Sequence, residues 1–125
     1  MKTSVKTSLA TAVTWMMLWI VPGHANDVEI VDAKARKSGN TWTFSVTLRH
    51  EDTGWDHYAD LWQVYSPEGK LLGERVLLHP HVEEQPFTRS LSGVEIPDET
   101  TEVVIKARDS VHGISPQEFR LSLPR

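Results

Sequence analysis

Thr41-Trp42-Thr43-Phe44-Ser45-Val46-Thr47-Leu48-Arg49 alternates large apolar side chains with threonine, serine and arginine. Successive side chains of a β-strand point to opposite faces, so an apolar period of two predicts a strand with one buried face and one face in water. We expect this strand to span residues 41–50. A tryptophan, a phenylalanine and two aliphatic residues on one face need a second apolar layer to pack against, and the rest of the chain must supply it.

Six further segments of the chain carry a strand pattern and are separated by turn-forming residues. Ser66-Pro67-Glu68-Gly69-Lys70 is a strong turn signal, because proline and glycine each favour particular turn positions. No segment shows the apolar period of an amphipathic helix. Seven short strands without a helix predict a single all-β sandwich. The six further strands are expected at residues 27–37, 58–65, 71–78, 87–96, 101–108 and 119–123.

The end of the chain resembles part of a known class of domain. From Val104 it reads Val-Ile-Lys-Ala-Arg-Asp-Ser-Val-His-Gly-Ile-Ser-Pro, and it then alternates apolar residues as far as Leu123. This run resembles the closing hairpin of fibronectin type III and related immunoglobulin-like domains, and Trp42 and Trp62 suit the core of such a domain. The resemblance implies a seven-stranded antiparallel immunoglobulin-like (fibronectin type III-like) sandwich, and that fold implies no function by itself.

Residues 1–25 have the composition of a signal peptide. Lys2 and Lys6 give a positive start, residues 9–21 are apolar, and Gly23-His24-Ala25 supplies small residues for cleavage after Ala25. The apolar run is shorter than the roughly 20 residues that span a bilayer, so no stable membrane anchor is expected after cleavage. No cysteine follows the cut, which excludes a lipid anchor at that point. We expect a mature domain of residues 26–125 that is periplasmic or secreted.

Charge and cysteine content narrow the classes of partner and the means of stabilisation. The formal charge of −4 becomes −6 when Lys2 and Lys6 are removed, which argues against a nucleic-acid partner because polyanions select clustered basic residues. The chain contains no cysteine, although an exported domain is free to form disulfides. The mature domain must therefore be stabilised by its core, and about 100 residues can bury enough surface for that.

The histidines are expected at one end of the sandwich. Hairpin-connected strands reverse direction, so the loops after the second, fourth and sixth predicted strands lie at the same pole. These loops are residues 50–57, 79–85 and 109–113, and together they contain the five histidines that follow the predicted cleavage site. The turns of the opposite pole contain none. We call the end formed by these three loops the histidine pole.

Imidazoles and carboxylates at this pole predict a transition-metal site. Proline holds His79-Pro80-His81 extended, so both imidazoles lie on one side and can reach one ion. Imidazole nitrogen suits Cu(II) and Zn(II), and carboxylates can complete or orient the ligand set. The alternative is that these side chains are solvated or hydrogen-bond to the loop backbone. The predicted ligands are His79 and His81, with His57 or His50 as a third, and with Glu83, Glu84, Asp56 or His112 in support.

Trp55 is an aromatic residue in the first loop of the histidine pole. It lies in the polar sequence Gly54-Trp55-Asp56. There it serves either as an exposed anchor for a partner or as a cap on the end of the core. A large ring has much apolar area to hide, which favours the cap.

Three classes of function fit these patterns, and the first is favoured. It is a small exported non-catalytic module that binds a metal or an envelope protein partner through the histidine pole. The second is a metalloenzyme, because Gly73, His79-Pro80-His81 and Glu84 resemble the first motif of the cupin family, a resemblance that implies metal ligands at the two histidines and the glutamate. The third is a structural or chaperone-like envelope domain that uses its strand edges.

Overall fold

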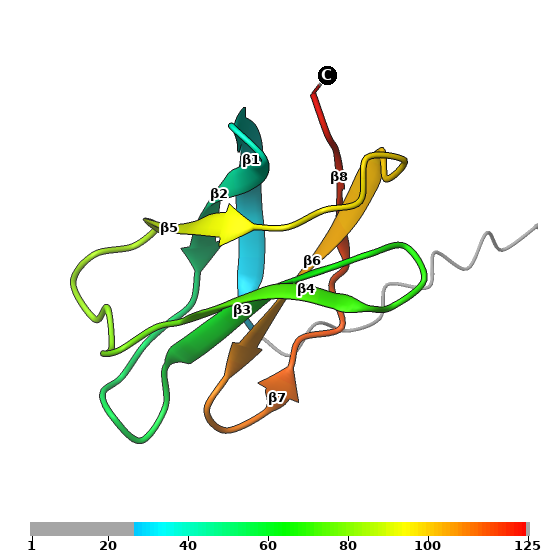
Figure 1. Ribbon diagram of the computed structural model, residues 1–125. Coiled ribbons are helices and arrows are strands. Elements are labelled where there is room, and N and C mark those ends of the chain that lie inside the picture. The colour runs from blue at the N-terminus through cyan, green and yellow to red at the C-terminus, as the bar shows by residue number, and fades with distance from the viewer. Residues whose placement is uncertain (1–26, 125) are drawn as a thin grey trace, which may run out of the picture.

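The computed structural model describes residues 27–124, which form two antiparallel sheets and no helix (Figure 1). The first sheet has the order β1 (Glu29–Ser38), β2 (Thr41–Arg49) and β5 (Phe87–Val94). The second has the order β4 (Leu71–Val76), β3 (Ala59–Tyr65), β6 (Glu102–Asp109) and β7 (Gly113–Ile114), and β8 (Phe119–Ser122) pairs with β6. The predicted all-β sandwich is confirmed. Within the described residues no helix could cross a membrane.

The core lies between the sheets and follows the alternation of β2. Trp42, Phe44, Val46 and Leu48 are buried, while the residues between them are at least partly exposed. Trp62 of β3 is 0% exposed and belongs to the same apolar cluster. Burying a large apolar side chain contributes about 1.5–3 kcal/mol, so these contacts between sheets stabilise a chain without disulfides. The predicted buried face and the predicted burial of Trp42 and Trp62 are confirmed.

The described residues contain eight strands where the sequence predicted seven. The added strand, β7, has two residues, which pair with Arg108 and Asp109 at the end of β6. Two residues are too few to show a period of two, so the sequence could not reveal this strand. Two other strands stop early, since β4 ends at Val76 and β5 at Val94. Gly93, inside β5, has a φ of 73° where the pairing of β5 with β2 shifts between Trp42 and Phe44, and glycine adopts this conformation readily.

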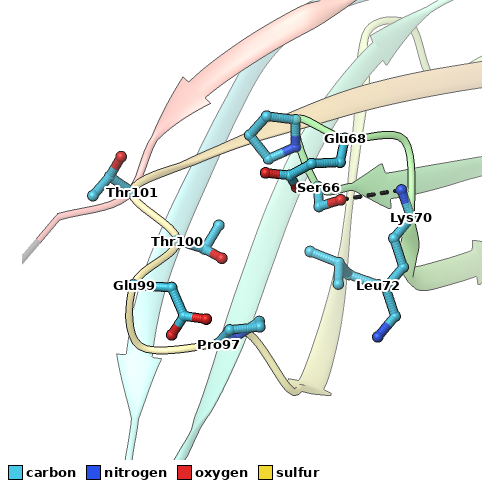
Figure 2. A pocket seen from close by; sticks show the side chains of 9 residues that line it. Ser66, Glu68, Lys70, Leu72, Pro97, Glu99, Thr100 and Thr101 are labelled. Atoms are coloured by element: carbon cyan, nitrogen blue, oxygen red, sulfur yellow. Dashed lines mark hydrogen bonds between the residues drawn. The ribbon is translucent and has the colours of Figure 1, made fainter.

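A pocket is lined by residues of the turns that lie at the other pole, and Figure 2 shows these residues from close by. It has a volume of about 420 Å³ and lies between the turn after β3 and the connection from β5 to β6. Ser66 shapes one wall, because its hydroxyl accepts a hydrogen bond from the N–H of Lys70 at 3.0 Å. The lining residues in the described part of the chain include no histidine.

Candidate metal centre

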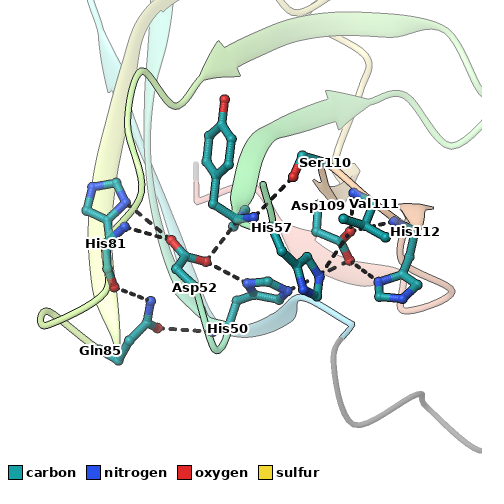
Figure 3. Close-up of polar contacts among 11 residues, drawn as sticks. His50, Asp52, His57, His81, Gln85, Asp109, Ser110, Val111 and His112 are labelled. Atoms are coloured by element: carbon teal, nitrogen blue, oxygen red, sulfur yellow. Dashed lines mark hydrogen bonds and ion pairs between the residues drawn. The ribbon is translucent and has the colours of Figure 1, made fainter. Parts of the chain in front are cut away.

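The three loops of the histidine pole meet in the structure, as the strand order predicted (Figure 3). Gln85 joins the first two loops: its side-chain oxygen accepts from the N–H of His50 at 3.0 Å, and its side-chain nitrogen donates to the carbonyl of His81 at 2.9 Å. The N–H of Tyr58, beside the first loop, donates to the Ser110 hydroxyl of the third at 3.1 Å. The gathering of the histidines at one pole is confirmed.

Asp109, the last residue of β6, is the centre of this pole. It is 1% exposed. Its Oδ1 accepts from the N–H groups of Val111 and His112 at 2.8 and 2.6 Å, and its Oδ2 lies 3.1 Å from Nδ1 of His112. Burial pushes the pKa of Asp109 up, but the hydrogen bonds from His112 and Val111 outweigh burial and hold the pKa below its ordinary value. The site is therefore built around a buried, charged carboxylate.

Two further imidazoles approach this carboxylate. Nε2 of His50 lies 3.8 Å from Oδ2 of Asp109, and Nε2 of His57 lies 3.6 Å from Oδ1. The Nε2 atom of His57 is buried and makes no hydrogen bond to the described residues. The His57 ring lies edge-on to His50 and to His112, with ring centroids 4.9 and 5.0 Å apart. Three imidazoles, two from the loop between β2 and β3 and one from the turn after β6, thus converge on one carboxylate.

Asp52 orients His50 from the side remote from Asp109. Its Oδ1 lies 2.5 Å from Nδ1 of His50 and accepts the N–H of Ala59 at 3.0 Å, while its Oδ2 accepts the N–H of His81 at 2.7 Å. A carboxylate only accepts, so Nδ1 of His50 donates the hydrogen bond to Asp52, and Nε2 of His50 is the ring nitrogen that faces Asp109. A histidine that binds a metal through one ring nitrogen usually donates the N–H of its other ring nitrogen to a carboxylate, which fixes the orientation of the ring.

The spacing of these atoms suits a metal ion. Ligand atoms about 2.0–2.1 Å from a tetrahedral Zn²⁺ lie roughly 3.3–3.4 Å from one another. The contacts of Asp109 with His112, His57 and His50 measure 3.1, 3.6 and 3.8 Å. In two overlapping groups, one ligand atom from each residue lies within 4.8 Å of the others. These groups are His50, His57 and Asp109, and Asp27, Asp109 and His112.

His79 and His81 lie side by side, with ring centroids 4.6 Å apart, yet neither belongs to these groups. The His81 ring stacks on Phe87 at 3.9 Å, and its Nε2 lies 2.9 Å from Nη2 of Arg89. Since a guanidinium only donates, His81 is the acceptor in this pair. Nδ1 of exposed His79 lies 3.0 Å from the carbonyl oxygen of Pro80. A metal site at these two histidines stays a prediction. An ion bound through Nε2 of His81 would displace Arg89, whereas Nδ1 of His81 makes no hydrogen bond to the described residues.

The other residues of the cupin-like motif have structural partners. A Cβ atom on Gly73 would lie 3.0 Å from Cδ2 of Leu91 and 3.2 Å from Cγ2 of Val94, so glycine at this position lets β4 approach β5 closely. Glu84 is exposed and pairs with Arg89 at 3.3 Å. The structure therefore brings together His50, His57 and His112 of the predicted ligands, and it does not place Glu84 with them.

Sequence reasoning missed the three aspartates of the site. Asp52 and Asp109 were treated as polar loop and turn residues, and Asp27 as the first residue of a strand. A signal existed for two of them, because Asp52 lies two residues after His50 and Asp109 lies three before His112. An acidic residue two or three positions from a histidine in a loop can lie at the same metal site as that histidine.

Trp55 does not cap the core, so that interpretation was wrong. Its residue surface is 69% exposed, and its ring makes an edge-on contact with Tyr58 at 5.7 Å. The ring stands on a polar loop whose turn is closed by paired backbone groups of Gly54 and His57. A role in binding a partner stays a prediction.

We expect acid to destabilise the fold through His81. Burial, Arg89 and His79 lower the pKa of His81 from 6.5, so the unfolded chain takes up a proton more readily than the folded protein does. The stability from the neutral ring is present above about pH 6.5 and is lost as the pH falls below it. Urea unfolding at about pH 7.5 and about pH 5.5 should show a smaller pH dependence for His81→Gln than for the native protein. Equal dependence in both would assign the effect to another group.

Comparisons with known proteins show the fold and leave the family open. No family model matches the chain. A putative lipoprotein from Halomicrobium mukohataei is 45% identical over 92 residues, which make up 73% of this chain and 45% of that protein. The chain therefore spans about half the length of this curated relative. The crystal structure of a hypothetical protein from Pyrococcus horikoshii OT3 matches with a TM-score of 0.55 and 14% identity, over 78% of this chain and 90% of that one. This likeness supports the two-sheet fold alone.

Proposed function

We propose that this protein is a small exported, non-catalytic module that binds Cu(II) or Zn(II) at the histidine pole through His50, His57, Asp109 and His112. One observation carries the proposal. The Nε2 atom of His57 is buried, makes no hydrogen bond to any residue that the structure describes, and lies with Nε2 of His50 against a buried carboxylate. A buried polar atom without a partner is costly, and a metal ion would give it one.

The ligands come from both sheets. His50 directly follows β2 of the first sheet, whereas Asp109 ends β6 and His57 precedes β3 in the second. An ion bound by these three residues ties the two layers together, as a disulfide does in other exported domains. This is a useful arrangement for a chain that has no cysteine. Metal binding should therefore also raise the stability of the fold.

Export to the cell envelope is part of the proposal. The predicted signal peptide of residues 1–25 lies outside the described residues, so its support is the sequence pattern. The name of the Halomicrobium mukohataei relative, a putative lipoprotein, supports an envelope location.

The fibronectin type III-like classification is likewise proposed, supported by β1-β2-β5 facing a sheet in which β6 lies between β3 and β8. An envelope protein partner remains a proposal, with Trp55 as its first contact.

The test is a titration of the metal-free protein with Cu(II) and with Zn(II), followed by calorimetry. We expect stoichiometric binding and a raised melting temperature. His57→Ala should weaken binding by more than about 100-fold, because loss of a supporting group alone typically costs 10–100-fold. The matched control is the His79→Ala/His81→Ala double variant, which should bind as the native protein does. If the double variant loses metal binding and His57→Ala retains it, the metal site lies at His79 and His81 instead.

A further inference from the structure

The exposed side of the metal centre faces the beginning of β1. The His112 side chain is 34% exposed, whereas the side chain of Asp109 is fully buried. Asp27, half-buried and two residues before β1, offers a carboxylate oxygen within 4.8 Å of ligand atoms of both. A carboxylate from the start of the chain thus lies at the exposed side of a site otherwise built from β2, β3 and β6.

A side-chain clamp holds this part of β1 in place. The Gln117 side chain accepts from the N–H of Ile30 at 2.8 Å and donates to its carbonyl at 3.1 Å. Both bonds lie at the point where the pairing of β1 with β2 shifts between Ile30 and Asp32. Val28, next to Asp27, is buried in the core. Asp27 itself precedes the first pair of β1 and β2, but it is attached to a segment that these contacts hold in place.

We propose that Asp27 is a fifth ligand of the same ion, so that the site is five-coordinate and not strictly tetrahedral, and that metal loading fastens the beginning of β1 to the turn after β6. This inference rests on the proposed function. Charge supports it, because a divalent cation is attracted by each carboxylate that faces it. Asp27 adds a second carboxylate beside Asp109 on the exposed side of the site.

The first experiment compares Zn(II) titrations of Asp27→Asn and Asp32→Asn with that of the native protein. Asp27→Asn keeps the shape of the side chain and removes its charge, and it should weaken binding by about 10–100-fold. Asp32 is an exposed acid of β1 outside both ligand groups, so its substitution should leave the affinity unchanged. Hydrogen exchange gives a second measurement, since Zn(II) should protect the amides of residues 28–30 in the native protein and not in Asp27→Asn.

Gln117→Ala tests whether the clamp acts through Asp27. It should weaken Zn(II) binding in the native background and cause no further loss in the Asp27→Asn background, because coupled residues are not additive. Native-like affinity in Asp27→Asn, with no Zn(II)-dependent protection of residues 28–30 in the native protein, would overturn this inference and leave the proposed metal function intact. A native protein that binds neither Zn(II) nor Cu(II) would overturn both.

Discussion

Asp109→Ala is expected to remove metal binding and to destabilise the metal-free fold. Asp109 is shared by both ligand groups, so its loss should weaken Zn(II) binding by more than about 100-fold. It also leaves the N–H groups of Val111 and His112 without their acceptor. A hydrogen bond to a charged group contributes about 1.5–3 kcal/mol, and these two are only part-buried, so their loss should cost roughly 3 kcal/mol in total. Zn(II) titration and urea unfolding of the metal-free protein measure the two effects separately.

Two variants separate charge from shape in this experiment. Asp109→Asn retains an oxygen that can accept the turn hydrogen bonds, so it should keep more of the stability than Asp109→Ala while still losing most of the metal affinity. Asp98→Ala removes an exposed acid from the connection between β5 and β6 and should change neither quantity. Tight Zn(II) binding by both Asp109 variants would contradict the proposed centre.

Asp52→Ala is expected to be the more destabilising substitution. The buried carboxylate accepts from Nδ1 of His50, from the N–H of Ala59 and from the N–H of His81. Removing it leaves buried donors unsatisfied in two loops, which should cost roughly 3–5 kcal/mol. Metal affinity should fall by about 10–100-fold, because His50 loses the group that orients it. Urea unfolding of the metal-free protein at neutral pH measures the loss of stability.

Asp56→Ala is the matched control, since Asp56 is an exposed acid in the same loop. Its effect should stay within about 0.5 kcal/mol, as for most surface substitutions. Equal stability of Asp52→Ala and Asp56→Ala would show that the bonds of Asp52 contribute nothing net to the fold. Together, the variants at Asp52 and Asp109 distinguish a carboxylate that supports the loops from one that binds the ion.

The sequence predicted the fold and the position of the site better than it predicted the ligands. The alternation along residues 41–49 is visible in consecutive residues, and the structure buries the expected face. The reversal of hairpin-connected strands predicted the histidine pole. The choice of His79 and His81 relied on their closeness in sequence, whereas the structure surrounds Asp109 with His50, His57 and His112. The polar neighbours of Trp55 allowed the exposed position that the structure shows, and the general tendency of large rings to be buried led to the wrong choice of a cap.

By itself, the sequence determined the alternating strands, the positions of most turns and the end of the sandwich at which the histidines lie. These follow from the backbone geometry of a few adjacent residues. The tertiary structure alone decided that His50 and Asp109, from different sheets, lie 3.8 Å apart. It also decided that Asp52 supports His50 from behind and that Asp27 reaches the exposed side. The packing of the two sheets and the pairing of strands far apart in the sequence set these distances, and a pattern of a few adjacent residues does not encode them.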